Sequence, residues 1–376
     1  MTTMKSAKTG ATGGDLTPGM RLFGAAATAY RAAVAGNPLA QRLARPDPVR
    51  PSGYDIDVVV DSSTVIAEDI RGISLRRADG ESFATWRPGS HIDVFLPTGM
   101  QRSYSLCGDP TDRGSYRISV RRLPAGDGGS LAMHELRPGD TLRIRGPRNA
   151  FPFHTAPSYL FVAGGIGITA ILPMVRAAEA AGARWRMVYL GRSRDSMAYL
   201  DELAELAANS ATGTVVVEPD DERGRPDIVR TLATAEPGAA VYMCGPPAMM
   251  TTARGIIGFI NPTATLHTER FSPTPVRGGH EFTVLVPGLS KAIDVGPDET
   301  TLDALRREIP GVAYSCRQGF CGSCRVGVIQ GEVDHRDRHL TAQERERNMM
   351  PCVSRAAGST LTLDLSSELH RSQDTR

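Results

Sequence analysis

The stretch Cys316-Arg-Gln-Gly-Phe-Cys321-Gly-Ser-Cys324, followed by Cys352 after twenty-seven further residues, decides how the end of this chain folds. Its spacing is that of plant-type [2Fe–2S] sites, in which four thiolates hold two irons. The two glycines and Ser323 let the loop turn tightly and direct backbone N–H groups at the sulfurs. Zinc or a disulfide pair is the alternative, but zinc sites repeat the Cys-x2-Cys spacing, which only Cys321 and Cys324 show. The pattern therefore predicts a two-iron cluster.

The composition is that of a globular protein with two or three domains. The chain has 376 residues, of which 41% are hydrophobic and 22% charged, and it contains no apolar run long enough to span a bilayer. The N-terminus shows no secretory pattern, so we expect a cytoplasmic protein, in which clustered thiols hold metal more often than they form disulfides. The formal net charge of +2 is too small to indicate nucleic acid as a partner.

Three kinds of local pattern divide the chain. Over residues 53–156, short alternating strands bounded by Gly, Pro or Asp predict an antiparallel β-barrel. Over 157–271, apolar strands alternate with helical stretches, one of them at 195–208, and predict a doubly wound parallel sheet. A linker rich in Pro and Gly at 272–280 leads to a hairpin, a helix and the cysteine loop within 281–376.

Residues 1–52 differ from the rest of the chain. They are rich in Ala, Gly, Thr and Pro, and they contain seven Lys or Arg against two Asp. Apolar residues at helical spacing predict one amphipathic helix near 19–35. We interpret this segment as a partly ordered N-terminal extension; a helix that docks on a partner or on the protein's own surface is the alternative.

The cysteine region, AYSCRQGFCGSCRVGVIQGEVDHRDRHLT with PCVSRA, resembles the C-terminal ferredoxin domain of the phthalate dioxygenase reductase and vanillate O-demethylase reductase family. The resemblance extends from about Tyr54 to the end of the chain and includes the domain order. It implies a flavin-binding β-barrel at 53–156, an NAD(P)H-binding α/β domain at 157–271 and a plant-type ferredoxin of the α+β (β-grasp) class at 281–376. It also implies FMN, with FAD as the less favoured alternative, and a terminal oxygenase as partner.

The barrel carries a candidate flavin site. Its residues are Arg102, Tyr104, Ser105, Gly128, Gly129 and Ser130. Arg102 and Tyr104 are alternate residues of one strand and so share a face, while the Gly-Gly-Ser turn opens a helix whose N–H groups suit a phosphate. The resemblance implies that Tyr104 stacks on the isoalloxazine ring, Ser105 bonds its edge and Arg102 pairs with the phosphate. Asp127 stands where the family often has Arg, which leaves the choice between FMN and FAD open.

The α/β domain carries a candidate nicotinamide site. Its residues are Gly164, Gly165, Gly167, Thr169, Cys244, Gly245, Pro246, Glu269 and Phe271. A glycine turn between strand and helix lets the backbone approach a pyrophosphate, although packing alone can also require glycine there. The resemblance places the Cys-Gly-Pro turn where nicotinamide meets flavin, with Cys244 positioning the ring, and it places Glu269 and Phe271 near the flavin. The alternatives are a small buried cysteine and a packed aromatic at a strand end. Cys107 is expected to be a packed apolar residue.

The loop GRSRDSM bears on which nicotinamide is used. Arg192, Ser193 and Arg194 could bind a 2′-phosphate, which would favour NADPH. The family resemblance points to NADH instead. We expect NADH, with NADPH as the alternative.

Together these motifs predict an oxidoreductase. Nicotinamide donates two electrons as hydride, a [2Fe–2S] cluster holds one, and a flavin can join the two; no acid–base residue is required. A plant-type cluster at about −400 mV can reduce a Rieske centre at about −150 mV or above, which favours a Rieske-type oxygenase as acceptor. A cytochrome P450 or another iron monooxygenase is the alternative acceptor, and a redox-sensing electron-carrier module is the alternative function.

Overall fold

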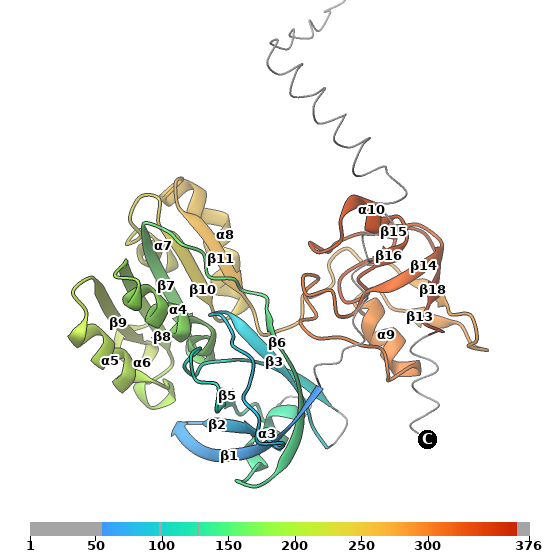
Figure 1. Cartoon of the computed structure of the whole chain (residues 1–376). Coiled ribbons are helices and arrows are strands. Elements are labelled where there is room, and N and C mark those ends of the chain that lie inside the picture. Colours follow the sequence, from blue (N-terminus) through green and yellow to red (C-terminus); the bar gives the residue numbers. More distant parts are fainter. Residues whose placement is uncertain (1–54, 98–99, 126–127, 367–376) are drawn as a thin grey trace, which may run out of the picture. The chain divides into compact units, whose positions relative to one another are not determined.

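The computed structural model describes residues 55–97, 100–125 and 128–366. They form one six-stranded sheet, two five-stranded sheets and a two-stranded ribbon (Figure 1). The amphipathic helix expected near 19–35 lies outside the described residues, as does Asp127. Within the described ranges, no helix has the length and apolar character that crossing a membrane requires.

The first sheet is the predicted antiparallel barrel, with strand order β4-β3-β6-β1-β2-β5. Its elements are β1 (Asp55–Ala67), β2 (Ile70–Arg77), β3 (Ser90–Phe95), β4 (Gln101–Ser105), β5 (Tyr116–Arg121), α3 (Gly129–Glu135) and β6 (Thr141–Asn149). The two edge strands meet, because the Cys107 amide after β4 donates to the Arg117 carbonyl of β5 at 2.9 Å. Alternate side chains such as Val58, Ile92 and Ile144 fill the interior.

The second sheet is the predicted parallel one, with strand order β11-β10-β7-β8-β9. Its elements are β7 (Ser158–Gly164), α4 (Ile168–Ala180), β8 (Arg184–Gly191), α5 (Leu200–Asn209), β9 (Gly213–Pro219), α6 (Asp220–Arg223), α7 (Ile228–Leu232), β10 (Ala240–Cys244), α8 (Pro247–Ile260) and β11 (Thr265–Glu269). Alternate residues of β7 join different cores. Tyr159 and Phe161 pack in the core that contains α4 and α5, whereas Leu160 and Val162 pack with α7 and α8. Helices therefore cover both faces, which makes the sheet doubly wound.

One helix is shorter than the sequence predicts. The pattern favours a helix over 195–208, but α5 begins only at Leu200. Tyr199, directly before it, has a left-handed φ of 66°, which a continuing α-helix does not allow. The Tyr199 hydroxyl contacts Ser119 Oγ of the barrel and lies 3.3 Å from Cys107 Sγ. A tertiary contact thus overrides the local helical pattern.

The third sheet has the strand order β13-β12-β18-β14-β16. The elements of this region are β12 (Phe282–Leu285), β13 (Ile293–Val295), α9 (Thr301–Glu308), β14 (Val326–Gln330), β15 (Val333–Asp334), α10 (Ala342–Arg345), β16 (Asn348–Met349), β17 (Arg355–Ala356) and β18 (Thr360–Asp364). Leu302 and Leu305 of α9 pack in one core with Leu361 and Leu363 of β18. The hairpin, the helix and the mixed sheet confirm the predicted β-grasp arrangement.

Candidate redox site

The four cysteines of the predicted cluster come together as two pairs. The Cys316 and Cys321 thiols are hydrogen-bonded to each other, and so are those of Cys324 and Cys352. Over the described ranges, no three His, Cys, Asp or Glu side chains are grouped as one metal ion would need. Two pairs of thiols suit two irons with two protein ligands each better than they suit one tetrahedral zinc ion.

Backbone geometry directs donors at these sulfurs, as the loop sequence predicts. The Gln318 amide donates to Cys316 Sγ at 3.3 Å. Gly319 and Gly322 have φ angles of 79° and 78°, a conformation that residues with a side chain rarely adopt. Such N–H groups offset the negative charge of thiolates that share a cluster.

The Cys321 thiol ionises most readily. A hydrogen bond from Cys316, assisted by Ser323, lowers the pKa of Cys321 to about 5. The pKa of Cys316 and that of Cys324 are raised, in each case first by the hydrogen bond to the paired thiol and then by burial. Because iron binds thiolates, one easily ionised thiol favours the first bond to the metal.

The structure brings two parts of the candidate flavin site together. Arg102 lies against the start of α3, where a Cβ on Gly129 would come within 2.4 Å of Arg102 Nε. A side chain at this position would push the guanidinium away from α3, and a guanidinium beside backbone N–H groups suits a phosphate. Ser130 Oγ accepts a hydrogen bond from the Leu123 amide at 3.0 Å and so closes the loop that precedes α3.

The remaining flavin residues lie on both faces of β4. Tyr104 is half-buried and packs against the barrel core, on the same face as Arg102. Ser105 is buried and lies opposite His91 of β3, on the other face by strand alternation. Ser105 is the last residue of β4.

The two nicotinamide turns pack backbone against backbone. A Cβ on Gly167 would lie 2.2 Å from the Cys244 carbonyl oxygen, and one on Gly164 would lie 2.6 Å from Pro246 Cδ. A Cβ on Gly245 would lie 3.0 Å from Gly164 Cα. The turns after β7 and β10 therefore form one surface at the carboxyl ends of neighbouring parallel strands, where α/β proteins bind nucleotides.

The turn after β7 is stabilised by hydrogen bonds among its own residues. Gly165 has a φ of 54° and starts a short 3-10 turn that leads into α4 at Ile168. Thr169 is buried, and its hydroxyl donates to the Ile166 carbonyl at 3.0 Å. The hydroxyl thus stabilises the turn, while the glycines provide the bare backbone that a pyrophosphate requires.

Glu269 and Cys244 are neighbours at the ends of β11 and β10, and both are buried. Burial raises the pKa of Glu269 to about 8. Burial, followed by the nearby Glu269, raises the pKa of Cys244. Glu269 Oε2 has no hydrogen-bond partner among the described side and main chains. Near neutral pH Glu269 is therefore protonated and can offer an O–H to a bound ring.

This buried carboxyl predicts a pH dependence of stability. The usual pKa is 4.5 and the folded value is about 8, so between these values the folded protein binds more protons than the unfolded chain. The free energy of unfolding should fall in this window by about 1.4 kcal/mol per pH unit and level off above it. Glu269→Gln should lack this contribution.

The check is thermal unfolding of the loaded protein between pH 5 and pH 9. The variant should gain stability over the wild type as pH rises to about 8, with no further gain above it. Parallel curves for the two proteins across the whole range would show that Glu269 does not titrate in this way.

Phe271 is 48% exposed and is not the packed strand end that the sequence left open as an alternative. It follows Glu269 by two residues, just beyond β11. An exposed aromatic ring at the carboxyl end of the sheet is available to cover a flat cofactor.

The loop that bears on NADH or NADPH has an acidic neighbour that the sequence did not reveal. Arg194 Nε donates to Glu222 Oε1 at 2.7 Å, and the Asp221 amide donates to the Arg192 carbonyl at 3.1 Å. Asp220 belongs to the same short helix, α6. The Glu222 carboxylate of α6 therefore pairs with Arg194, one of the two arginines expected to attract a 2′-phosphate.

The contacts that join the barrel to the α/β domain were also not predicted. Arg176 of α4 donates to the carbonyl oxygens of Cys107 at 2.9 Å and Gly108 at 2.8 Å, and it pairs with Glu202 of α5. Cys107 is buried, as expected, but its thiol also contacts Tyr199. The sequence signal for this junction is an arginine that follows the apolar first part of α4, Ile168–Val175.

Three family models match successive parts of the chain. Residues 57–153 match an oxidoreductase FAD-binding domain, 161–255 an oxidoreductase NAD-binding domain, and 285–357 a 2Fe-2S iron-sulfur cluster binding domain. Together with the paired cysteines and the joined glycine turns, these matches define the class: a flavin- and NAD-binding iron–sulfur oxidoreductase.

Relatives narrow this class. Phthalate dioxygenase reductase from Burkholderia cepacia is 36% identical over 313 residues, which cover 81% of this chain and 95% of that protein. The solved structure of a phthalate dioxygenase reductase aligns with a TM-score of 0.62 at 34% identity, over 83% of this chain and 98% of that one. The chain belongs to the phthalate dioxygenase reductase family.

A second solved structure comes from a longer enzyme. An intact type IV self-sufficient cytochrome P450 monooxygenase aligns with a TM-score of 0.67 at 40% identity. The alignment covers 88% of this chain but only 44% of the monooxygenase, so this chain spans less than half of that protein.

Proposed function

We propose that this protein is an NADH-dependent reductase that supplies single electrons to a Rieske-type oxygenase. When bound, the flavin accepts hydride from the nicotinamide and the [2Fe–2S] cluster carries the electrons onward one at a time. The observation that carries the proposal is the arrangement of the cysteines, Cys316 with Cys321 and Cys324 with Cys352. Two pairs of thiols would hold a [2Fe–2S] cluster, which carries one electron at a time, in a chain that also binds a two-electron donor.

The chain's own residues would bind and orient the groups. Arg102 and the turn at Gly128–Ser130 would hold the flavin phosphate, Tyr104 would stack on the ring, and Ser105 would bond its edge. We favour FMN, as the family resemblance implies, with its phosphate beside the Arg102 guanidinium. We also propose the domain boundaries 53–156, 157–271 and 281–376, joined by the linker 272–280.

The nicotinamide would bind across the joined turns. Gly164–Thr169 would receive the pyrophosphate, and Cys244–Pro246 would position the ring. Glu269 would hold a proton near the flavin, and Phe271 would cover the flavin face from which the nicotinamide ring must displace it. Because NADH and reduced thiols are both maintained in the cytoplasm, we propose that the protein works there.

We propose NADH as the donor because Glu222 of α6 pairs with Arg194 of the loop that would otherwise receive a 2′-phosphate. Glu222→Gln would release Arg194 for a 2′-phosphate, so the ratio of kcat/KM for NADPH to that for NADH should rise about fivefold. Steady-state rates with both nucleotides provide the measurement. Adding Arg194→Ala to Glu222→Gln should abolish the gain, and an unchanged ratio in Glu222→Gln would remove this explanation of the preference.

The acceptor is tested by reconstitution. The likeness to a cytochrome P450 monooxygenase makes a haem protein the second candidate acceptor. The purified reductase and NADH should be combined with a Rieske oxygenase, with a cytochrome P450, or with cytochrome c as a general one-electron acceptor. We expect the reductase to reduce the Rieske protein faster than the P450. Faster reduction of the P450 would favour the haem acceptor. No turnover with any of the three, with flavin and iron present, would instead indicate a redox-sensing module.

A further inference from the structure

The strand pair β3–β4 turns its two faces to different parts of the chain. Arg102 and Tyr104, on one face of β4, belong to the candidate flavin site. Ser103, between them, points the other way and lies opposite Asp93 of β3. Its hydroxyl donates to Asp93 Oδ1 at 2.6 Å. One layer of backbone thus separates the flavin side from the side that carries Asp93.

Asp93 joins the barrel to the cysteine loop. It is 0% exposed, and its Oδ1 also accepts a hydrogen bond from Ser315, the residue before Cys316, at 2.8 Å. Its Oδ2 accepts from Arg148 Nη1 at 2.9 Å, and the same Nη1 donates to Ser323 Oγ at 2.9 Å. Both ends of the cysteine loop are therefore bonded to one carboxylate–guanidinium pair on the barrel.

Further bonds seat the residues beside Ser315. Gln101 of β4 donates through Nε2 to the Tyr314 carbonyl, and the Tyr314 hydroxyl donates to the Gln101 carbonyl at 3.2 Å. His91 Nε2 lies 3.4 Å from Ser315 Oγ, and burial lowers the pKa of His91. The loop is thus held by direct bonds to three strands of the barrel, β3, β4 and β6.

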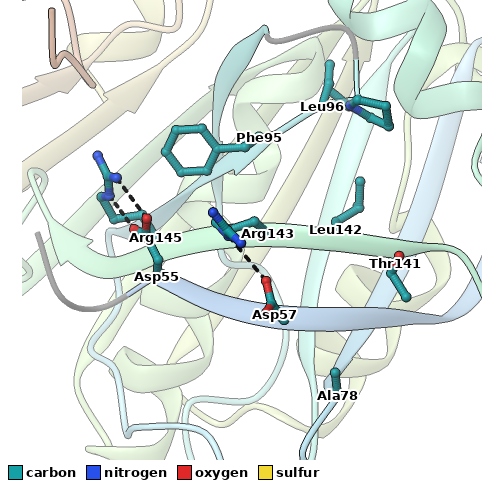
Figure 2. A pocket seen from close by; sticks show the side chains of 10 residues that line it. Asp55, Asp57, Ala78, Phe95, Leu96, Thr141, Leu142, Arg143 and Arg145 are labelled. Atoms are coloured by element: carbon teal, nitrogen blue, oxygen red, sulfur yellow. Dashed lines mark hydrogen bonds and ion pairs between the residues drawn. The ribbon is translucent and has the colours of Figure 1, made fainter. Parts of the chain in front are cut away.

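An ion pair on the outer face of this barrel can form without burial, as a second pair shows. Asp57 and Arg143 form a similar pair farther along the same outer face, where both side chains are more than half exposed (Figure 2). A buried carboxylate is costly unless several donors satisfy it, and Asp93 receives three side-chain hydrogen bonds. The Asp93 carboxylate of this pair is buried where the cysteine loop covers the face, which indicates that the role of the pair concerns the loop.

We propose that Asp93 and Arg148 are the positioning residues for electron transfer from the flavin to the cluster. They fix the cysteine loop against the strand whose other face carries the flavin residues, so the distance between the two centres stays short. Electron transfer slows steeply with distance, and a fixed loop makes a domain movement unnecessary. Each NADH supplies two electrons, so two single transfers to the cluster and onward to the acceptor return the flavin to its oxidised form. The inference rests on the flavin and cluster sites proposed above.

The test is anaerobic stopped-flow reduction of the loaded protein by NADH, with flavin and cluster followed by their separate absorbance. Asp93→Asn keeps the size of the side chain and removes its charge. The rate of flavin reduction should stay within twofold, and the rate of cluster reduction should fall at least tenfold. Loss of a negative charge beside the loop should raise the cluster's midpoint potential, which alone would speed the transfer. If electron transfer to the cluster is slower although the cluster's midpoint potential is higher, the cause is a changed position of the cluster and not a changed driving force.

Two further variants make the outcome decisive. Asp57→Asn removes a carboxylate from the exposed pair on the same face and should change neither rate. Ser315→Ala removes one bond between loop and barrel without leaving a buried charge unpaired, so it should fold even if Asp93→Asn does not, and it should slow cluster reduction several-fold. Cluster reduction at the wild-type rate in Asp93→Asn, or in Ser315→Ala if Asp93→Asn does not fold, would overturn the proposal. Wild-type protein that lacks flavin or iron would overturn the proposed function itself.

Discussion

Replacement of Cys324 by alanine should abolish the iron–sulfur cluster and disconnect the donor from the acceptor. Cys324 is buried and hydrogen-bonded to Cys352, so no other described cysteine can take its place without rebuilding the loop. Changes in residues that merely support a metal ligand already cost 10- to 100-fold in affinity or activity, so loss of a ligand should cost at least about a hundredfold in electron delivery to an oxygenase. Iron content should fall to near zero.

Flavin reduction in this variant should remain, because the barrel and the α/β domain are untouched. The measurement is iron content together with two rates, flavin reduction by NADH and reduction of the oxygenase. Cys107→Ala is the matched control, since it removes another fully buried thiol outside the loop. It should retain iron and both rates. A Cys324→Ala protein that keeps its iron and reduces the oxygenase normally would refute the assignment of the ligand.

Replacement of Gly167 by alanine should block the reaction at the opposite end, where NADH enters. The added Cβ would lie 2.2 Å from the Cys244 carbonyl oxygen, a contact with backbone that no side-chain movement can relieve. The turns after β7 and β10 must then separate, which displaces the proposed pyrophosphate and nicotinamide positions together. Misplacement by about 1 Å can cost a hundredfold in rate, so flavin reduction by NADH should fall by about that factor.

The control for this variant is Gly255→Ala. Gly255 lies in α8 of the same domain, and a Cβ there would meet nothing within 4 Å. This change should be neutral or slightly stabilising, because alanine favours a helix by about 1 kcal/mol over glycine. Both proteins should retain flavin and iron, which shows that they fold. Equal rates of flavin reduction in the two variants would contradict the nicotinamide site.

The sequence predicts those features that depend on residues close together in the chain. The spacing Cys316, Cys321 and Cys324 predicts the cluster loop, because three ligands lie within nine residues. Strand alternation correctly places Arg102 and Tyr104 on one face of β4. Glycine between strand and helix locates the turn at Gly164, and the structure explains its need for glycine by the close approach of the second turn.

The features that the sequence does not predict depend on contacts between distant segments. Asp93 and Ser315 lie 222 residues apart, and no local pattern announces that they bond. The sequence signal for this contact is the carboxylate of Asp93 in the strand HIDVF. If that strand is buried, donors from other segments must satisfy the carboxylate. Glu222 likewise reaches Arg194 across 28 residues.

In this account, one polypeptide joins a hydride donor to a one-electron iron centre through a flavin. The experiment that tests this connection is anaerobic titration of the purified protein with NADH, followed by visible absorbance and electron paramagnetic resonance. We expect two irons and one flavin per chain, with NADH alone producing the signal of a reduced [2Fe–2S] cluster. A protein that carries zinc on its last four thiols, or whose cluster stays oxidised after NADH has reduced the flavin, would contradict the account.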